Sequence, residues 1–558
     1  MKKYRRYGAA LVAVLLLGSV FQSETAQAGR KISPNVQSLG LAFTENSEIG
    51  RMPSIIYAQG DINDPTTWLM CTDFEDKVCT DASGLFGYSN WEICNEQSTI
   101  ACIADVWAVK PTGEKIMGEY IKPVPLDPRY VVKENKSINL PHSNGIGAVW
   151  RLPGVINSAG KDTYFVAAQS VLNAQKTPGT PVKNVHLELS QLIAAILPVE
   201  ELAGNYQLIF ASDANHGAKA WGGNGTRYAP DGAACAATEL TYCEAIRQFP
   251  TGYRFGMTLR MGAKTQGWYH GRLYRPEIST KGWKSGQEIS VEAEPVKVAS
   301  LNFTVPNSQI PQKIRDLISS DKTFGVIGDG EGPTKIVENI SGPYSLDLVS
   351  GFAPAYGDKA TATDTYWSFK TLGYGQDEST RKCSDKAGNL AGLVTTNALA
   401  YAAGPPDFDK NSGLLTYKVS SPHFEANGDF ASGSYDLTLR SDVARCVYGF
   451  TDAPIKAEIS VTSQDGEKKV ATTVVNEKDG WLYLSAKGFT FSSPTINVKL
   501  TQEKVASAPS PTPSASASAS ASAAPIAKKS VTISCVKGKI TKKVTSSNPK
   551  CPPGYKKK

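Results

Sequence analysis

The chain has 558 residues, 41% of them hydrophobic and 9% aromatic, which is ample for buried cores and more than one core usually organises, so we expect two or more domains. Charge is uneven: the net +7 combines +3 in residues 1–28, +10 in residues 528–558 and −6 between them. After the N-terminal segment no stretch approaches the roughly 20 apolar residues of a membrane-spanning helix, which excludes a helical integral membrane protein.

The N-terminus has the layout of a secretory signal. Basic residues precede an apolar run over residues 9–20, and Ala26-Gln27-Ala28 supplies an A-x-A cleavage site. We therefore expect a signal peptide over residues 1–28, a mature chain that begins at Gly29, and no transmembrane anchor. The expected location is secreted, extracellular or cell-wall-associated.

Ten cysteines in an exported chain predict disulfide bonds. No two of them have the C-x-x-C spacing of a zinc site, so we expect no metal and no other cofactor. The sequence leaves open a nested pairing of the first four cysteines, Cys71 with Cys102 and Cys79 with Cys94. The predicted bridges, chosen by equal short spacing and then by elimination, are Cys71–Cys79, Cys94–Cys102, Cys235–Cys243, Cys383–Cys446 and Cys535–Cys551.

Alternation of apolar and polar residues is the dominant pattern. It is clear in residues 252–261 and recurs in 435–439, 459–461 and 496–500, and Asn-Gly and Asp-Gly pairs follow at turn distances. Such short strands predict a mainly β protein. The predicted fold class is two or more antiparallel β-sandwich-like domains, a disordered linker and a small disulfide-stapled C-terminal β module.

The strongest candidate for ligand recognition is the basic segment 245–276, which carries six Lys and Arg residues and no acid. In residues 267–276, strand alternation would place aromatic and basic side chains on one face, where they could stack on sugar rings and bind carboxylates or phosphates. The alternative is that Trp268 and Tyr274 belong to the core and the arginines are merely solvated. The predicted ligand-binding residues are Arg254, Arg260, Trp268, His270, Arg272 and Tyr274.

Helical patterns are few. Residues 190–201 are apolar enough for a short helix that Pro198 interrupts, and residues 311–319 predict a helix capped by Ser308. We place a domain boundary at this second helix. The predicted parts are a signal peptide (1–28), one or more N-terminal β-rich domains (29–306), a β-sandwich-like domain (307–502), a Ser/Ala/Pro-rich linker (503–527) and a Lys-rich, disulfide-stapled module (528–558).

The last 29 residues, 530–558, contain eight lysines and no acid. A module this small needs a covalent staple, which Cys535–Cys551 would supply. Its lysines would bind an anionic polymer through salt-sensitive attraction, whereas the alternative is a solubilising end that binds nothing. The predicted envelope-attachment residues are Lys537, Lys539, Lys542, Lys543, Lys550, Lys556, Lys557 and Lys558.

Two stretches resemble recurring segments of known proteins. ISCVKGKITKKVTSSNPKCPPGYKKK (533–558), behind its Ser/Ala/Pro linker, resembles the C-terminal tail of secreted, β-rich surface proteins of actinobacterial type, and residues 441–502 are similar to a β-rich module in such proteins. The resemblance covers about a sixth of the chain. It implies export and a modular organisation, and it implies no particular activity.

Motifs for catalysis are scarce. Neither H-E-x-x-H nor G-x-S-x-G occurs. Residues 158–161 match S-x-x-K and residues 284–286 resemble K-T-G, but the connecting motif of penicillin-recognising enzymes is missing. Residues 407–413 space oxygen ligands as a calcium loop does, yet the glycine is one position late and a lysine replaces the closing glutamate, which favours an Asx turn. These observations disfavour an enzyme without deciding the question.

We therefore expect an exported, non-catalytic surface or envelope protein with a binding, structural or adhesive role. The cationic module would retain it on anionic cell-envelope polymer, and the basic aromatic hairpin would bind an extracellular glycan. We expect no nucleic acid partner, because no recognised binding motif accompanies the basic segment. The alternatives are a secreted hydrolase that acts on glycan or peptide and a self-assembling lattice. The sequence does not predict an oligomeric state.

Overall fold

The structure is a computed structural model. The predicted signal peptide (1–28) and linker (503–527) lie outside the residues it describes. Those residues are 37–45, 54–59, 69–71, 74, 77–126, 131–206, 228–263, 267–320, 334–337, 343–372, 381–384, 390–462, 468–470, 474–491, 494–502, 531–537, 540–546, 551 and 555–557.

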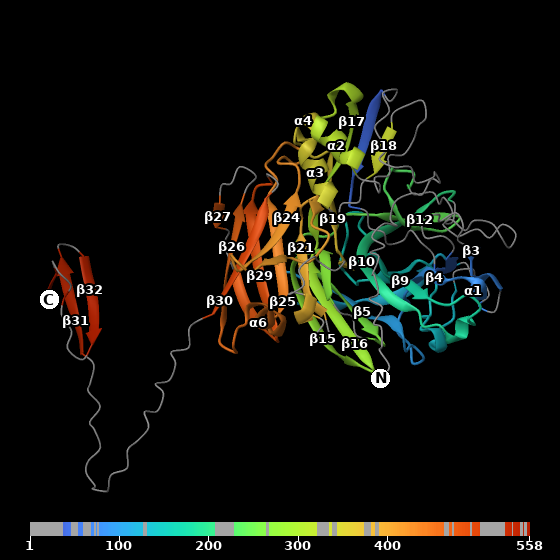
Figure 1. Ribbon diagram of the computed structural model, residues 1–558, viewed down its shortest axis with the longest axis horizontal. Helices are drawn as coiled ribbons and strands as arrows, with labels where there is room; N and C mark the ends of the chain where they lie inside the picture. The colour runs from blue at the N-terminus through green and yellow to red at the C-terminus, as the bar shows by residue number, and fades with distance from the viewer. Residues whose placement is uncertain are drawn as a thin grey trace, which may run out of the picture. The chain divides into compact units, whose positions relative to one another are not determined.

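A large central sheet organises the body of the protein (Figure 1). Two further pairs of strands branch from its main path. One pair, β12 and β11, is joined to the path through β10, and the other pair, β8 and β7, is joined through β9. The main path runs β28 (Val474–Lys478), β29 (Trp481–Phe489), β25 (Gly433–Arg440), β21 (Leu390–Thr396), β14 (Gly267–Arg272), β20 (Ser368–Thr371), β10 (Glu188–Ala203), β9 (Thr163–Gln175), β4 (Gly84–Asn90), β2 (Ile55–Gln59) and β3 (Leu69–Met70). The branches are β12 (Tyr242–Ile246), β11 (Cys235–Thr238), β8 (Gly147–Arg151) and β7 (Glu119–Val124).

A five-stranded antiparallel sheet packs on one face of the central sheet. Its alternating apolar residues, such as Met257 and Val291, meet Val166 and Ala194 of the central sheet in one buried cluster. The burial of these alternating positions stabilises the two-layer packing. The order of this sheet is β15 (Tyr274–Trp283), β16 (Gly286–Glu294), β13 (Arg254–Met261), β5 (Ala101–Val109) and β6 (Lys115–Met117).

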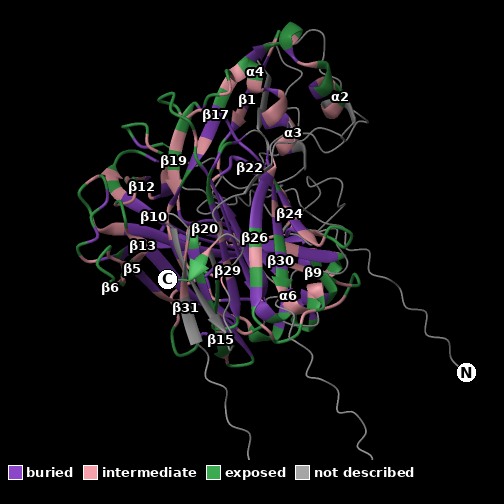
Figure 2. Cartoon of the chain, turned by 90° about the vertical axis from the view of Figure 1, so that its left-hand side faces the viewer, coloured by how far each residue is buried: buried purple, intermediate pink, exposed green. Residues whose placement is uncertain are grey.

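A six-stranded sheet lies beside β25 and β29 (Figure 1). Tyr417, Ile459 and Val498 of this sheet share a second buried cluster with Leu437 and Leu482 of the central sheet. The central sheet is therefore covered by sheets on both faces, and its strands are coloured as buried over much of their length (Figure 2). The strands are β22 (Ala400–Tyr401), β24 (Leu414–Ser420), β30 (Thr495–Gln502), β26 (Ile455–Thr462) and β27 (Lys468–Val470), with β23 (Asp407–Asp409) paired to β24.

A four-stranded sheet and several short helices complete the body. Ile314, on the helix 312–320, and Phe352, between the helices 343–351 and 353–356, pack with Leu41 and Leu301 of this sheet. The strands are β18 (Thr334–Val337), β1 (Ser38–Phe43), β17 (Val296–Pro306) and β19 (Ala362–Tyr366). Helices in the described part of the body include α1 (Lys77–Asp81), α2 (Gln312–Ser320), α3 (Pro343–Gly351), α4 (Ala353–Tyr356) and α6 (Ser441–Tyr448), with the short 3-10 helices η3 (Lys136–Ile138), η4 (Val182–Asn184) and η5 (Asn307–Gln309).

The predicted fold class is confirmed, since the protein is mainly β, with antiparallel sheets and sandwich-like packing. The helix predicted at residues 311–319 corresponds to α2, whereas the helix predicted at 190–201 is wrong, because these residues belong to strand β10. Residues 192–199 are buried without interruption, and an apolar run covered on both faces has no periodicity that separates strand from helix.

The chain divides into two compact units, Met1–Glu503 and Lys504–Lys558. The predicted boundary at residue 306 does not coincide with a break between sheets, because β14, from before it, lies between β20 and β21, from after it. The second unit contains a three-stranded sheet in the order β32 (Ile540–Ser546), β31 (Val531–Lys537) and β33 (Lys556–Lys557). In the part of the chain that the structure describes, every helix is too short or too polar to cross a membrane.

The predicted disulfides of the body are confirmed. Cys71–Cys79 and Cys94–Cys102 form as short loops, which excludes the nested alternative, and Cys235–Cys243 and Cys383–Cys446 form as well. Cys551 of the C-terminal unit is also disulfide-bonded.

Candidate functional site

The basic segment predicted to be a recognition hairpin is divided between two sheets. Arg254 and Arg260 lie on β13 of the five-stranded sheet, whereas Trp268, His270 and Arg272 lie on β14 of the central sheet. The neighbours of β14 are β20 and β21 rather than β13. The six predicted ligand residues therefore do not share one surface.

Strand β14 is buried on both faces, so alternation along it does not separate a core face from a ligand face. Trp268, His270 and Arg272 are 4%, 2% and 1% exposed, and they point toward the cluster shared with the six-stranded sheet. Tyr269 points into the opposite cluster and is fully buried. Gly392 on β21 leaves room for the indole, because a Cβ there would lie 2.3 Å from Cζ3 of Trp268.

Arg272 is held by four hydrogen-bond acceptors inside the protein. Its Nε donates to Oε2 of Glu45 at 2.6 Å. Its terminal nitrogens donate to three backbone carbonyls at the end of β21 and just after it, namely those of Thr396 at 2.9 Å, Ala398 at 2.5 Å and Leu399 at 3.0 Å. This guanidinium therefore fixes the 396–399 turn and the Glu45 segment, and it is inaccessible to a glycan at the surface.

His270 is part of the same interior cluster. Its ring stacks on Tyr401, with centroids 3.6 Å apart and planes inclined by 4°, and the guanidinium of Arg272 lies 4.7 Å from the centroid of that tyrosine. Burial, reinforced by the charges of Arg272 and Lys370, holds the pKa of His270 well below its usual value. His270 is therefore a neutral core residue and not a cationic ligand contact.

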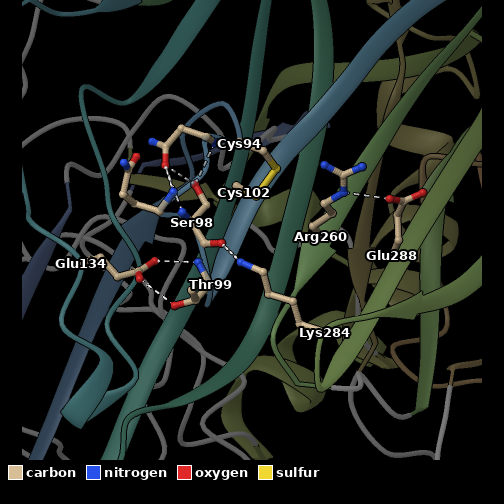
Figure 3. The surroundings of a disulfide bond; sticks show 10 residues. Cys94, Ser98, Thr99, Cys102, Glu134, Arg260, Lys284 and Glu288 are labelled. Carbon is tan, nitrogen blue, oxygen red and sulfur yellow. Dashed lines mark hydrogen bonds and ion pairs between the residues drawn. A yellow bond between two sulfur atoms is a disulfide. The ribbon is translucent and has the colours of Figure 1, made fainter.

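The two arginines of β13 are paired with carboxylates of β16. Arg254 Nε donates to Glu292 at 2.9 Å, and Arg260 Nε donates to Glu288 at 2.8 Å (Figure 3). The sixth predicted residue, Tyr274, is half-buried at the start of β15. The basic segment 245–276 contains these arginines but not their partners, because Glu288 and Glu292 lie on the following strand β16.

The Cys94–Cys102 disulfide lies close to Arg260 and closes a loop that three separate contacts hold in place (Figure 3). Glu134 accepts hydrogen bonds from the backbone N of Thr99 at 3.0 Å and from its Oγ1 at 2.7 Å. Lys284 donates through Nζ to the carbonyl of Ser98. This arrangement is rigid and internally satisfied, which is typical of a structural loop.

Removing the Cys94–Cys102 bridge should lower the free energy of unfolding, mainly because the unfolded chain gains conformational entropy. For C94S/C102S we expect the free energy of unfolding to fall by up to about 2.5 kcal/mol, the chain-entropy estimate for so short a loop. Urea unfolding followed by tryptophan fluorescence would measure this. A loss well above that value would show that the native loop, and not only the unfolded chain, depends on the bridge.

Residues 407–413 form the turn that the sequence favoured over a calcium loop. Asp409 accepts from the backbone N of Asn411 at 2.9 Å and from Oγ of Ser412 at 2.6 Å, the pattern of an Asx turn. Within the described part of the chain, no three His, Cys, Asp or Glu residues gather in a geometry that could hold a metal ion.

A pair of carboxyl groups, of which Glu244 is buried and Glu201 is more than half exposed, lies where β7, β10 and β12 meet, and sequence reasoning missed it. Glu244 on β12 is 1% exposed, and Lys122 Nζ lies 3.9 Å from its Oε1. The same Nζ donates to Glu201 at 2.8 Å and to the Tyr242 hydroxyl at 3.0 Å. Burial, together with the charge of Glu201, raises the pKa of Glu244 to about 7, although Lys122 opposes the shift. The available sequence signal was a glutamate within the otherwise apolar strand 242–246.

The C-terminal unit brings several predicted attachment residues together on one small sheet. Lys542 and Lys557 are the cross-strand partners of Cys535 on its two sides, and Lys543 and Lys556 occupy the neighbouring register positions opposite Ser534 and Val536. Lys556 and Lys557 are exposed. Lys537 ends β31, whereas Lys539, Lys550 and Lys558 lie outside the described residues.

Comparison with family models, curated proteins and solved structures yields no match to this chain. The functional argument therefore depends on the chain's own residues.

Proposed function

We propose that this protein is exported and acts, without catalysis, at the cell surface or envelope, where its Lys-rich C-terminal unit retains it on an anionic polymer. The observation that carries the proposal is the three-stranded sheet, whose register gathers four lysines around Cys535 in a segment that contains no acid. Neighbouring strands lie about 5 Å apart, so β32 and β33, on the two sides of β31, are about 10 Å apart, a distance that one segment of a polyanion can span.

The disulfide chemistry of the chain supports the proposed location. Four bridges form in the body and Cys551 is bridged in the C-terminal unit, and such bridges persist in oxidising compartments. The signal-like N-terminus and the resemblance of the tail to those of secreted surface proteins of actinobacterial type support export independently. The basic segment 245–276 contributes no binding role to this proposal, since its central residues are buried.

The proposal is tested by removing the second unit. The mature chain and a version that ends at Gln502 are applied to a polyphosphate resin at 0.05 M salt and eluted with a salt gradient. We expect the mature chain to bind and to elute as salt rises, because screening weakens charge attraction, and we expect the truncated chain to pass through. Equal behaviour of both chains would remove the attachment model.

A further inference from the structure

The β11–β12 hairpin is attached to the central sheet beside two carboxyl groups that face each other directly. In the antiparallel register of β10 and β12, Glu201 is the partner of Glu244. Like charges at directly opposite positions destabilise strand pairing. The hairpin lies at an edge, since β11 pairs with β12, and the Cys235–Cys243 bridge joins the two strands into one unit.

A single lysine, Lys122, lies near both carboxyl groups, and its one positive charge cannot neutralise two negative charges. Lys122 sits just after a register shift in β7, and its Nζ is closer to Glu201, at 2.8 Å, than to Glu244, at 3.9 Å. Burial alone would lower the pKa of Lys122, but its hydrogen bonds to Glu201 and Tyr242 outweigh burial and raise it, so the lysine stays charged. Oε1 of Glu244 has no hydrogen-bond partner within the described part of the chain.

Other roles fit this cluster less well. Glu244 is almost fully buried, so it cannot touch an external substrate, and the ammonium of Lys122 already occupies the space between the two carboxyl groups. Two further ionisable groups lie near the cluster, Tyr242 on β12 and Glu239 just before it. Burial, with smaller contributions from the charges of Glu239 and Glu244, raises the pKa of Tyr242, although Lys122 opposes the shift. Tyr242 is neutral and Glu239 is an acid, so neither supplies a positive charge that would offset the repulsion between Glu201 and Glu244.

We propose that the β11–β12 hairpin is a pH-responsive edge of the central sheet. It stays paired with β10, the closed state, while the Glu201–Glu244 pair holds a proton, and it separates from β10 more readily, to an open state, when that proton is lost. The closed state binds the proton more tightly than the open state, in which Glu244 meets water and has its usual pKa near 4.5, against about 7 in the closed state. The stability of the closed state therefore falls as pH rises from 4.5 to 7 and levels off above 7. This inference does not depend on attachment through the C-terminal unit.

Hydrogen–deuterium exchange of the full mature chain at pH 5 and pH 8 tests the proposal, with rates corrected for the intrinsic pH dependence of exchange. With a pKa of about 7 in the closed state and 4.5 in the open state, the opening constant of the hairpin should be roughly 70-fold larger at pH 8. Peptides that cover β12 should show this increase, and peptides that cover β9 should not.

Two variants separate titration from a general loss of structure. E244Q keeps the side-chain shape and removes the ionisation, so the corrected exchange of β12 should become independent of pH. E201Q retains Glu244 but removes the opposing charge, which leaves a one-to-one pair with Lys122 and should reduce the pH effect. E114Q, in an exposed pair with Lys110, is the control that should behave as the wild type.

Equal corrected rates for β12 at the two pH values in the wild type would overturn the proposal. It would equally fail if E244Q retained the full pH dependence, because another group would then be responsible.

Discussion

Replacing Arg272 by alanine is expected to lower the free energy of unfolding by about 3–5 kcal/mol, the usual cost of removing one partner of a buried ion pair. The Glu45 side chain is only 6% exposed, so R272A would leave its carboxylate buried without a cation. The carbonyls of Thr396, Ala398 and Leu399 would lose their donors at the same time. Urea unfolding followed by tryptophan fluorescence would measure the loss.

R151A is the matched control for this experiment. Arg151 also pairs with a glutamate across neighbouring strands, but both side chains are more than half exposed, so this pair should contribute little to stability. R272K adds an intermediate test, since lysine retains the charge but lacks the planar fork that reaches Glu45 and three carbonyls together. If R272A unfolded at the wild-type urea concentration, the proposed structural role of Arg272 would be refuted.

The burial of Arg272 is a property that the sequence alone did not predict. An Arg and a His that alternate with apolar residues predict a half-exposed strand, and the prediction of a strand was right. Which layers cover that strand is a matter of topology, because its neighbours β20 and β21 and the six-stranded sheet come from residues more than 80 positions later. The complementary partners that make burial of a charge possible, Glu45 above all, are equally remote in sequence.

Local features were predicted well because local chemistry decides them. The strand at Arg254–Met261 has its alternating apolar positions fully buried, and the equally spaced cysteine pairs close as expected. By contrast, the Glu201–Glu244 pair depends on the register of two strands separated by about forty residues. Without that register, the sequence shows only a glutamate within an otherwise apolar strand and gives no sign that a second glutamate lies opposite it.

The other large effect is expected in the C-terminal unit, where K542Q/K543Q/K556Q/K557Q should abolish most binding to polyphosphate at 0.15 M salt. Each lysine that neutralises an anionic group releases about one counterion, so the slope of log affinity against log salt should become shallower by about four. We expect affinity to fall at least ~100-fold at this salt concentration, as the loss of several such contacts usually costs. Elution from the polyphosphate resin over a series of salt concentrations gives both quantities.

The decisive control removes four positive charges from the body instead of from the C-terminal unit. K297Q/K418Q/K487Q/K499Q alters four exposed lysines of the body and changes the net charge by the same amount. If general charge attracts the protein to the polymer, both variants should weaken binding equally, because long-range attraction depends on net charge. If the small sheet binds the polymer, only the variant in that sheet should release it, since its two outer strands hold the four lysines within reach of one polymer segment. Equal losses in the two variants would therefore contradict local binding even if the truncated chain failed to bind.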